Sequence, residues 1–84
     1  MDIFFSKSSI KQLEKLNPRF KQKIIFTLEK FKDNRPVDII KLRNKPSEFR
    51  IRAGSYRIQL EKVDKGFLVT KIGKRENFYA VFIL

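Results

Sequence analysis

Apolar residues recur every three or four positions in the first third of the chain, which is the spacing of one face of an α-helix. This spacing predicts a first helix that ends near Leu16 and whose serine-rich start, from Ser6, provides caps for its N-terminus. Asn17 and Pro18 then suit the N-cap and the first turn of a second helix, which should end near Asp33. The pattern therefore predicts a helical hairpin with one buried side.

The second helix carries apolar residues on one side and lysines on the other. Its apolar stripe consists of Phe20, Ile24, Leu28 and Phe31, with Ile25 at the edge. Such a stripe is typical of a helix that packs against a core. A groove for a partner helix is the alternative interpretation.

The second half of the chain alternates between apolar and polar residues, as β-strands with one buried face do. Strands are expected at residues 2–6, 49–53, 56–61 and 67–73. Residues 37–46 should form a loop along the edge of the core, and the apolar residues 78–84 fit either a strand or a short helix. The order of these elements predicts an α+β fold in one domain, residues 1–84. In this fold an N-terminal strand and a helical hairpin pack on a twisted antiparallel sheet.

A tight turn at Gly54–Ser55 sets the register of the first predicted hairpin. A two-residue turn there pairs Arg52 with Arg57 and leaves one face of the hairpin apolar. The other face carries Arg50, Arg52 and Arg57. Because like charges directly opposite each other destabilise a sheet, a chain selected for stability alone would avoid this pair.

A second turn, Asp64–Gly66, extends the sheet by one more strand. With three residues in this turn, Val63 pairs with Phe67, and Gln59 pairs with Lys71. The residues that then face the core are Leu68, Thr70 and Ile72. The opposite face, which we call the arginine face, comprises Arg50, Arg52, Arg57, Lys71 and Arg75. Four guanidinium groups provide forked donors that match phosphate oxygens, and a solvated face balanced by nearby glutamates is the alternative.

The overall charge supports a polyanionic ligand. Among the 84 residues are 20 Lys and Arg and 9 Asp and Glu, which gives a net charge of +11. Between Ile39 and Leu60 the basic residues are Lys41, Arg43, Lys45, Arg50, Arg52 and Arg57, and Glu48 is the acidic one. A basic helix lying on a membrane is disfavoured because this cluster falls on strand-like sequence. The alternative interpretation is a basic surface that only keeps the protein soluble.

Missing residue types exclude several kinds of chemistry. The chain contains no Cys and no His, so disulfides, thiolate nucleophiles and the most common general base and metal ligand are absent. We therefore expect no metal and no cofactor. No run of about 18 apolar residues is present to span a membrane. The N-terminus does not read as a signal peptide, so we expect a cytoplasmic protein.

Four motifs of the chain are distinctive: Ile40-Lys41-Leu42, Phe49-Arg50-Ile51-Arg52, Gly54-Ser55-Tyr56-Arg57-Ile58 and Gly73-Lys74-Arg75-Glu76-Asn77-Phe78-Tyr79. The most specific part is the basic alternating strand, glycine turn and Tyr-Arg-Ile strand at residues 49–58. These motifs and the order of elements resemble the RelE/ParE superfamily of toxins from bacterial and archaeal toxin–antitoxin pairs. The resemblance covers nearly the whole chain.

The resemblance implies an mRNA interferase, an endoribonuclease that enters the ribosomal A site and cuts the message there. The 2′-hydroxyl of the mRNA attacks the adjacent phosphate without a metal. By motif, Arg57, Arg75 and Tyr79 match the catalytic residues of the family. Arg50 and Arg52 stand where its type member has lysines. Further residues expected to bind nucleic acid are Lys41, Arg43, Lys45, Lys71 and Lys74. The resemblance also implies an acidic antitoxin as partner.

The arginines at positions 50 and 52 change the proton chemistry of the site, because a guanidinium effectively cannot lose a proton. Tyr79 or Lys71 is then left as a general base, and Tyr79 could instead stack on a base. Two other functions remain open. One is a ParE-like toxin that inhibits DNA gyrase, and the other is a catalytically degenerate nucleic-acid-binding toxin.

Overall fold

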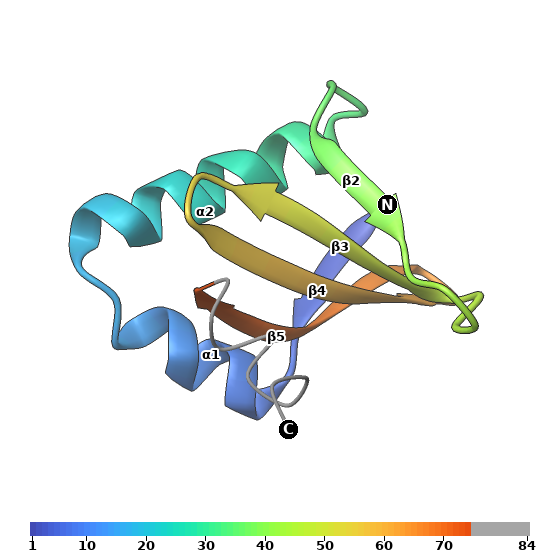
Figure 1. Ribbon diagram of the computed structural model, residues 1–84, viewed down its shortest axis with the longest axis horizontal. Coiled ribbons are helices and arrows are strands. Elements are labelled where there is room, and N and C mark those ends of the chain that lie inside the picture. The colour runs from blue at the N-terminus through green and yellow to red at the C-terminus, as the bar shows by residue number, and fades with distance from the viewer. Residues whose placement is uncertain (75–84) are drawn as a thin grey trace.

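The computed structural model describes residues 1–74, which form two helices and five strands (Figure 1). In chain order they are β1 (Asp2–Phe5), α1 (Lys7–Glu14), α2 (Pro18–Lys32), β2 (Asp38–Lys41), β3 (Glu48–Ala53), β4 (Tyr56–Val63) and β5 (Gly66–Lys74). The strand order in the sheet is β1-β5-β4-β3-β2. The predicted α+β fold is thus confirmed. The sheet is antiparallel from β2 to β5, as expected, but mixed overall, because β1 pairs parallel to β5.

The two helices begin where their caps were predicted. The side chain of Ser6 accepts a hydrogen bond from the Ser9 amide at 3.1 Å, and that of Asn17 accepts one from the Arg19 amide at 2.9 Å. Pro18 occupies the first turn of α2, where its missing N–H costs no hydrogen bond. Neither helix is long and apolar enough to cross a membrane.

The core lies between α2 and one face of the sheet. The fully buried aliphatic residues are Ile24, Ile51, Ile58, Leu60 and Val69. From the predicted α2 stripe, Leu28 is also buried and Phe31 packs against this cluster. Phe20 lies at the rim, 36% exposed, with its ring centroid 5.2 Å from that of Tyr56. The stripe therefore packs as predicted, except at its N-terminal end.

Residues 37–46 were expected to form a loop, but they include the edge strand β2. It pairs antiparallel with β3, with Asp38 opposite Arg52 and Lys41 opposite Phe49. The strand has no alternating signature because Ile39 and Ile40 are adjacent. Ile39 packs against the core, whereas Ile40 is 55% exposed on the edge.

The turn between β4 and β5 has two residues rather than three, since Val63 pairs with Gly66. A β-bulge then restores the predicted pairing of Gln59 with Lys71, because Thr70 has no residue opposite it on β4. The predicted pair of Val63 with Phe67 is therefore wrong. The bulge also puts Val69, instead of Leu68 and Thr70, into the core beside Ile72.

Gly66 allows β1 to lie close to β5. A Cβ at this position would collide with the backbone oxygen of Asp2, so no other residue fits the parallel pairing without a backbone shift. The amide of Asp2 is bonded to the carbonyl of Lys65 at 3.0 Å. These contacts anchor the N-terminus to the β4–β5 turn.

Candidate nucleic-acid interface

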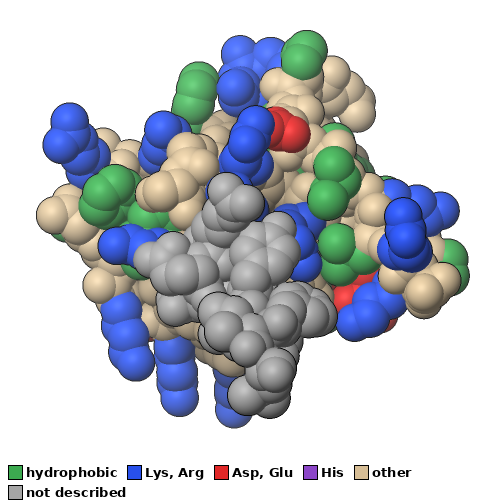
Figure 2. Space-filling view, in the orientation of Figure 1, with side chains coloured by type: hydrophobic (Ala, Val, Ile, Leu, Met, Phe, Trp, Pro, Cys, Tyr) green, Lys and Arg blue, Asp and Glu red, His purple; other side chains and the backbone are tan. Residues whose placement is uncertain are grey.

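The β3–β4 hairpin brings two arginines side by side. Gly54 occupies the turn with φ +64°, a left-handed conformation that glycine adopts without strain. The register is the predicted one, with Arg52 opposite Arg57 and Arg50 opposite Gln59. These side chains leave the sheet on the face that does not pack against α2. Figure 2 shows basic side chains spread over the visible surface, with acidic ones at only a few places.

Arg57 is the most deeply buried cation of this face among residues 1–74. It is only 9% exposed, and its Nη1 donates to the carbonyl oxygens of Gly54 and Tyr56, both at 3.2 Å. Within residues 1–74 no carboxylate forms a salt bridge with it. Its neighbour on β5 is Gly73, which has no side chain to block it. A buried cation held by carbonyl dipoles is electrostatically suited to an incoming phosphate.

Arg52 lies between a like charge and an opposite one. On β4 its neighbour is Arg57, and on β2 its neighbour is Asp38. Both Nε and Nη2 of Arg52 lie 2.6 Å from Oδ2 of Asp38. This ion pair offsets the repulsion that the hairpin register creates. Sequence reasoning missed Asp38 because it expected no strand there.

Arg50 and Lys71 form the next rung of the arginine face. Both are partly buried, and Gln59 lies between them on β4. The side-chain amide of Gln59 donates to Oε1 of Glu48 at 3.1 Å. The central strands thus carry two neighbouring rungs, with Arg52 and Arg57 on one and Arg50 and Lys71 on the other.

Of the remaining predicted binding residues, only Lys74 lies near the Gly54 turn. Lys41, Arg43 and Lys45 are exposed on β2 and its connection to β3, at the end of β3 that lies away from the Gly54 turn. Lys74 ends β5 opposite Tyr56, near the turn. Two of the three predicted catalytic residues, Arg75 and Tyr79, lie outside the described residues, as does the predicted element at 78–84.

A further cation reaches the turn from the other side of the sheet. The ammonium of Lys23, on α2, lies against Gly54, where an added Cβ would come within 2.7 Å of Nζ. No periodic signal in the sequence singles out this lysine, because it looks like any other residue on the polar side of the helix. Among residues 1–74, no group of carboxylates is arranged to hold a metal ion.

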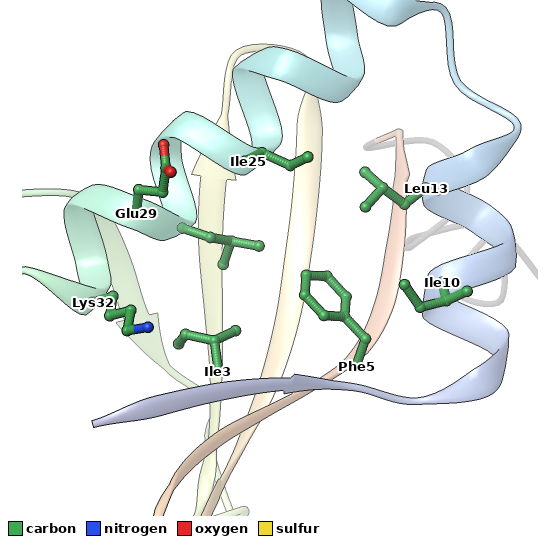
Figure 3. Close-up of a pocket in the computed structure, with 8 residues that line it drawn as sticks. Ile3, Phe5, Ile10, Leu13, Ile25, Glu29 and Lys32 are labelled. Carbon is green, nitrogen blue, oxygen red and sulfur yellow. The ribbon is translucent and has the colours of Figure 1, made fainter.

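An apolar groove lies beside α2, on the side of the helix that faces α1 and β1. It has a volume of about 350 Å³ and lies between α1, α2 and β1 (Figure 3). Ile3 and Phe5 line it from β1, Ile10 from α1 and Ile25 from α2. Leu28 of the predicted α2 stripe also lines the groove, so the stripe borders this opening as well as the core, and the alternative of a groove for a partner stays a prediction.

No family model matches the sequence, and no curated protein matches it either. Solved structures, however, match the fold over most of its length. The RelE chain of a RelB–RelE antitoxin–toxin complex from Methanococcus jannaschii superposes with a TM-score of 0.80 at 24% identity, covering 94% of this chain and 98% of that one. The chain has the RelE fold.

Two structures from E. coli extend this likeness. The intact RelBE toxin–antitoxin complex matches with a TM-score of 0.68 at 26% identity, covering 88% of this chain and 95% of that one. The isolated RelE toxin matches with a TM-score of 0.70 at 23% identity, covering 96% and 93%. Each alignment covers at least 88% of both chains, so the likeness extends over most of the RelE chain and is not confined to one part of it.

Proposed function

We propose that this protein is the toxin of a toxin–antitoxin pair and cuts mRNA on the ribosome. The observation that carries the proposal is the buried guanidinium of Arg57, held at the hairpin end of the sheet beside Arg52. The likeness to RelE toxins supports it. A ribosomal substrate would place the protein in the cytoplasm.

In the proposed reaction the 2′-oxygen of a nucleotide forms a bond to the adjacent phosphorus, and the bond from phosphorus to the 5′-oxygen breaks. The 2′-hydroxyl loses a proton and the leaving oxygen gains one. Negative charge builds on the phosphoryl oxygens during the attack, and a prearranged cation stabilises it best. We assign this role to Arg57 together with Arg75, and proton transfer or base stacking to Tyr79.

The remaining basic residues act on the ground state. Arg50, Arg52 and Lys71 hold the backbone of the message along the arginine face, which raises affinity without accelerating the chemical step. Lys41, Arg43, Lys45 and Lys74 contribute sequence-independent attraction. Variants of Arg57, Arg75 and Tyr79 should therefore lower kcat, whereas variants of the binding residues should mainly weaken RNA binding.

Single-turnover cleavage on programmed ribosomes tests the role of Arg57. We expect Arg57→Ala to reduce the rate at saturating ribosome by about 100- to 1000-fold, as loss of one well-placed donor does. Arg57→Lys should recover little, because an ammonium cannot make a two-pronged contact with phosphate. Arg43→Ala removes the same charge from the β2–β3 connection and is the matched control, because Arg43 is assigned a part in binding and none in the rate at saturation.

Two results would contradict the proposal. If Arg57→Ala cuts at the wild-type rate once saturated, Arg57 only binds. If induction of the protein in cells leaves mRNA without codon-phased cuts in primer extension but damages DNA, the function is that of a gyrase inhibitor.

We also propose that an acidic antitoxin binds the chain. Three of the similar structures come from organisms as different as M. jannaschii, Pyrococcus horikoshii and E. coli, and each is a complex of RelE with RelB. A net charge of +11 would steer an acidic chain onto this protein. The helical hairpin or the apolar residues Val81–Leu84, which lie outside the described residues, would supply the apolar contact. Co-expression with the acidic reading frame beside the gene should restore growth.

A further inference from the structure

The outer side of α2 carries a row of cations with one exposed aromatic ring among them. Its members, which we call the α2 ridge, are Arg19, Lys23, Phe26, Lys30 and Arg35. The first four are spaced by four, three and four residues, so they follow one side of the helix. The carboxylate within α2, Glu29, lies instead beside the apolar groove with Lys32 (Figure 3). The ridge is thus a basic surface separate from the arginine face.

Phe26 is exposed and has cations beside it. It is 54% exposed, with Nζ of Lys30 at 5.4 Å and the guanidinium carbon of Arg35 at 5.8 Å from the ring centroid. Both distances are in the range of a cation–π contact. An exposed ring beside two cations offers a stacking surface and a phosphate contact at the same place.

The end of α2 holds Arg35 in position. Asn34 adopts φ 60°, the Asn34 amide bonds to the Phe31 carbonyl at 3.1 Å, and the Arg35 amide bonds to the Lys30 carbonyl at 2.8 Å. These are the two hydrogen bonds of a Schellman motif. The motif turns the chain back over the last helical turn, so Arg35 returns to Phe26 instead of continuing the helix direction.

Lys23 connects the ridge to the arginine face. Its ammonium lies against Gly54, and the carbonyl oxygen of Gly54 accepts a hydrogen bond from Arg57. Cations from the two sides of the sheet therefore meet at the β3–β4 turn. The backbone of a nucleic acid can therefore pass from the arginine face to the α2 ridge while its phosphates stay close to cations.

We propose that the α2 ridge binds unpaired RNA, with a base stacked on Phe26 and neighbouring phosphates on the flanking cations. The ring favours RNA over an acidic protein segment, since carboxylates need only the cations whereas a nucleobase uses the exposed ring as well. The inference relies on the proposed function only for the choice of RNA. It assigns a second contact for the strand that the arginine face holds.

A binding titration on the full chain tests this site. The probe is a labelled oligouridylate with one 2-aminopurine, whose affinity is followed by anisotropy across a range of NaCl concentrations. Phe26→Leu should weaken binding by about 5- to 150-fold and abolish the quenching of 2-aminopurine. Phe4→Leu, at another exposed phenylalanine on β1, is the matched control and should leave both unchanged.

The cations are tested with a charge-matched pair of triple variants. Replacing Arg19, Lys23 and Lys30 with Gln should make the slope of log K against log[salt] shallower by about 2, because each phosphate contact to a single strand contributes about 0.7. The control replaces Lys7, Lys11 and Lys15, three exposed lysines of the α1 region, with Gln and removes the same charge. Its slope should stay near that of the wild type.

Three outcomes would overturn the inference. Equal losses in the two triple variants would mean that only net charge matters. Equal RNA affinities of the Phe26→Leu and Phe4→Leu variants would mean that no base stacks on Phe26. If the ridge variants bind RNA normally but lose polyglutamate, the ridge serves an acidic protein. A chain that fails to cut ribosomal mRNA but shows the expected ridge effects would refute the proposed function and leave this inference intact.

Discussion

Asp38 determines how the arginine face tolerates its own charge. The hairpin turn places Arg52 directly opposite Arg57, and this arrangement costs stability. Asp38 contacts Arg52 from the neighbouring strand, and both side chains are at least half exposed. An ion pair so accessible to water contributes little stability of its own, about 0.2–1 kcal/mol. In the proposed function its larger effect would be to occupy Arg52 until an RNA phosphate competes for the guanidinium.

Replacing Asp38 should therefore change stability and binding in opposite directions. We expect Asp38→Asn to lower the free energy of unfolding by up to about 1 kcal/mol in urea titrations. The same variant should bind RNA more tightly, with a salt slope steeper by about 0.7, because Arg52 becomes available for a phosphate. Glu14→Gln on α1 makes the same change in net charge, and an equal gain in affinity there would contradict the assignment.

Among the elements, α1 protects the edge of the sheet. β1 covers β5 only as far as Val69, opposite Phe5. At that point α1 contacts the strand as well, since the buried hydroxyl of Ser9 donates to the Val69 carbonyl at 2.9 Å. Oε1 of Gln12 accepts from the Ile72 amide at 2.7 Å. Ser9 thus adds a second donor to a carbonyl that already accepts from the Ser6 amide, whereas Gln12 satisfies an amide of β5 that pairing with β1 leaves without a partner strand.

The contact from Gln12 can be tested alone. Gln12→Ala removes the acceptor of the Ile72 amide, and a polar group left unsatisfied typically costs about 1–3 kcal/mol. We expect a loss of unfolding free energy of this order and faster hydrogen exchange at the Ile72 amide. Gln22→Ala on the exposed side of α2 removes the same side chain and should change neither. Unaltered exchange at Ile72 would show that the bond does not matter in solution.

At the scale of the whole molecule, charge opposes folding. A net charge of +11 is spread over a chain whose radius of gyration is 12.4 Å. Basic residues cover both the arginine face and the helical hairpin, so repulsion acts across the molecule as well as within each surface. Binding of a polyanion would remove this repulsion. The cations that would bind the polyanion therefore lower the stability of the free protein.

Salt should therefore stabilise the free protein. Raising NaCl from about 0.1 M to about 1 M shortens the Debye length from about 10 Å to about 3 Å and screens the repulsion. We expect the midpoint of urea unfolding to rise over this range. The variant with Gln at positions 7, 11 and 15 should gain less, because it begins with three fewer charges. A midpoint that falls with salt would mean that the Asp38–Arg52 contact outweighs the repulsion.

Local interactions made much of the fold and of the site predictable. Ser6 and Asn17 cap their helices with residues a few positions away, and the Gly54 turn sets the register of its own hairpin. The pairing of Arg52 with Arg57 could therefore be read from a stretch of ten residues. Such features depend on backbone geometry and short loops, which neighbouring residues determine.

Contacts between distant parts of the chain decided the rest. The pairing of β1 with β5 depends on Gly66, more than sixty residues away from its partner strand, and the bulge at Thr70 changes which side chains enter the core. Asp38 reaches Arg52 only because β2 joins the sheet, and Lys23 reaches Gly54 only because α2 packs across it. The period-two and helical patterns of the sequence indicate which side of a strand or helix is buried. They do not state which elements meet, because that choice depends on packing the whole core at once.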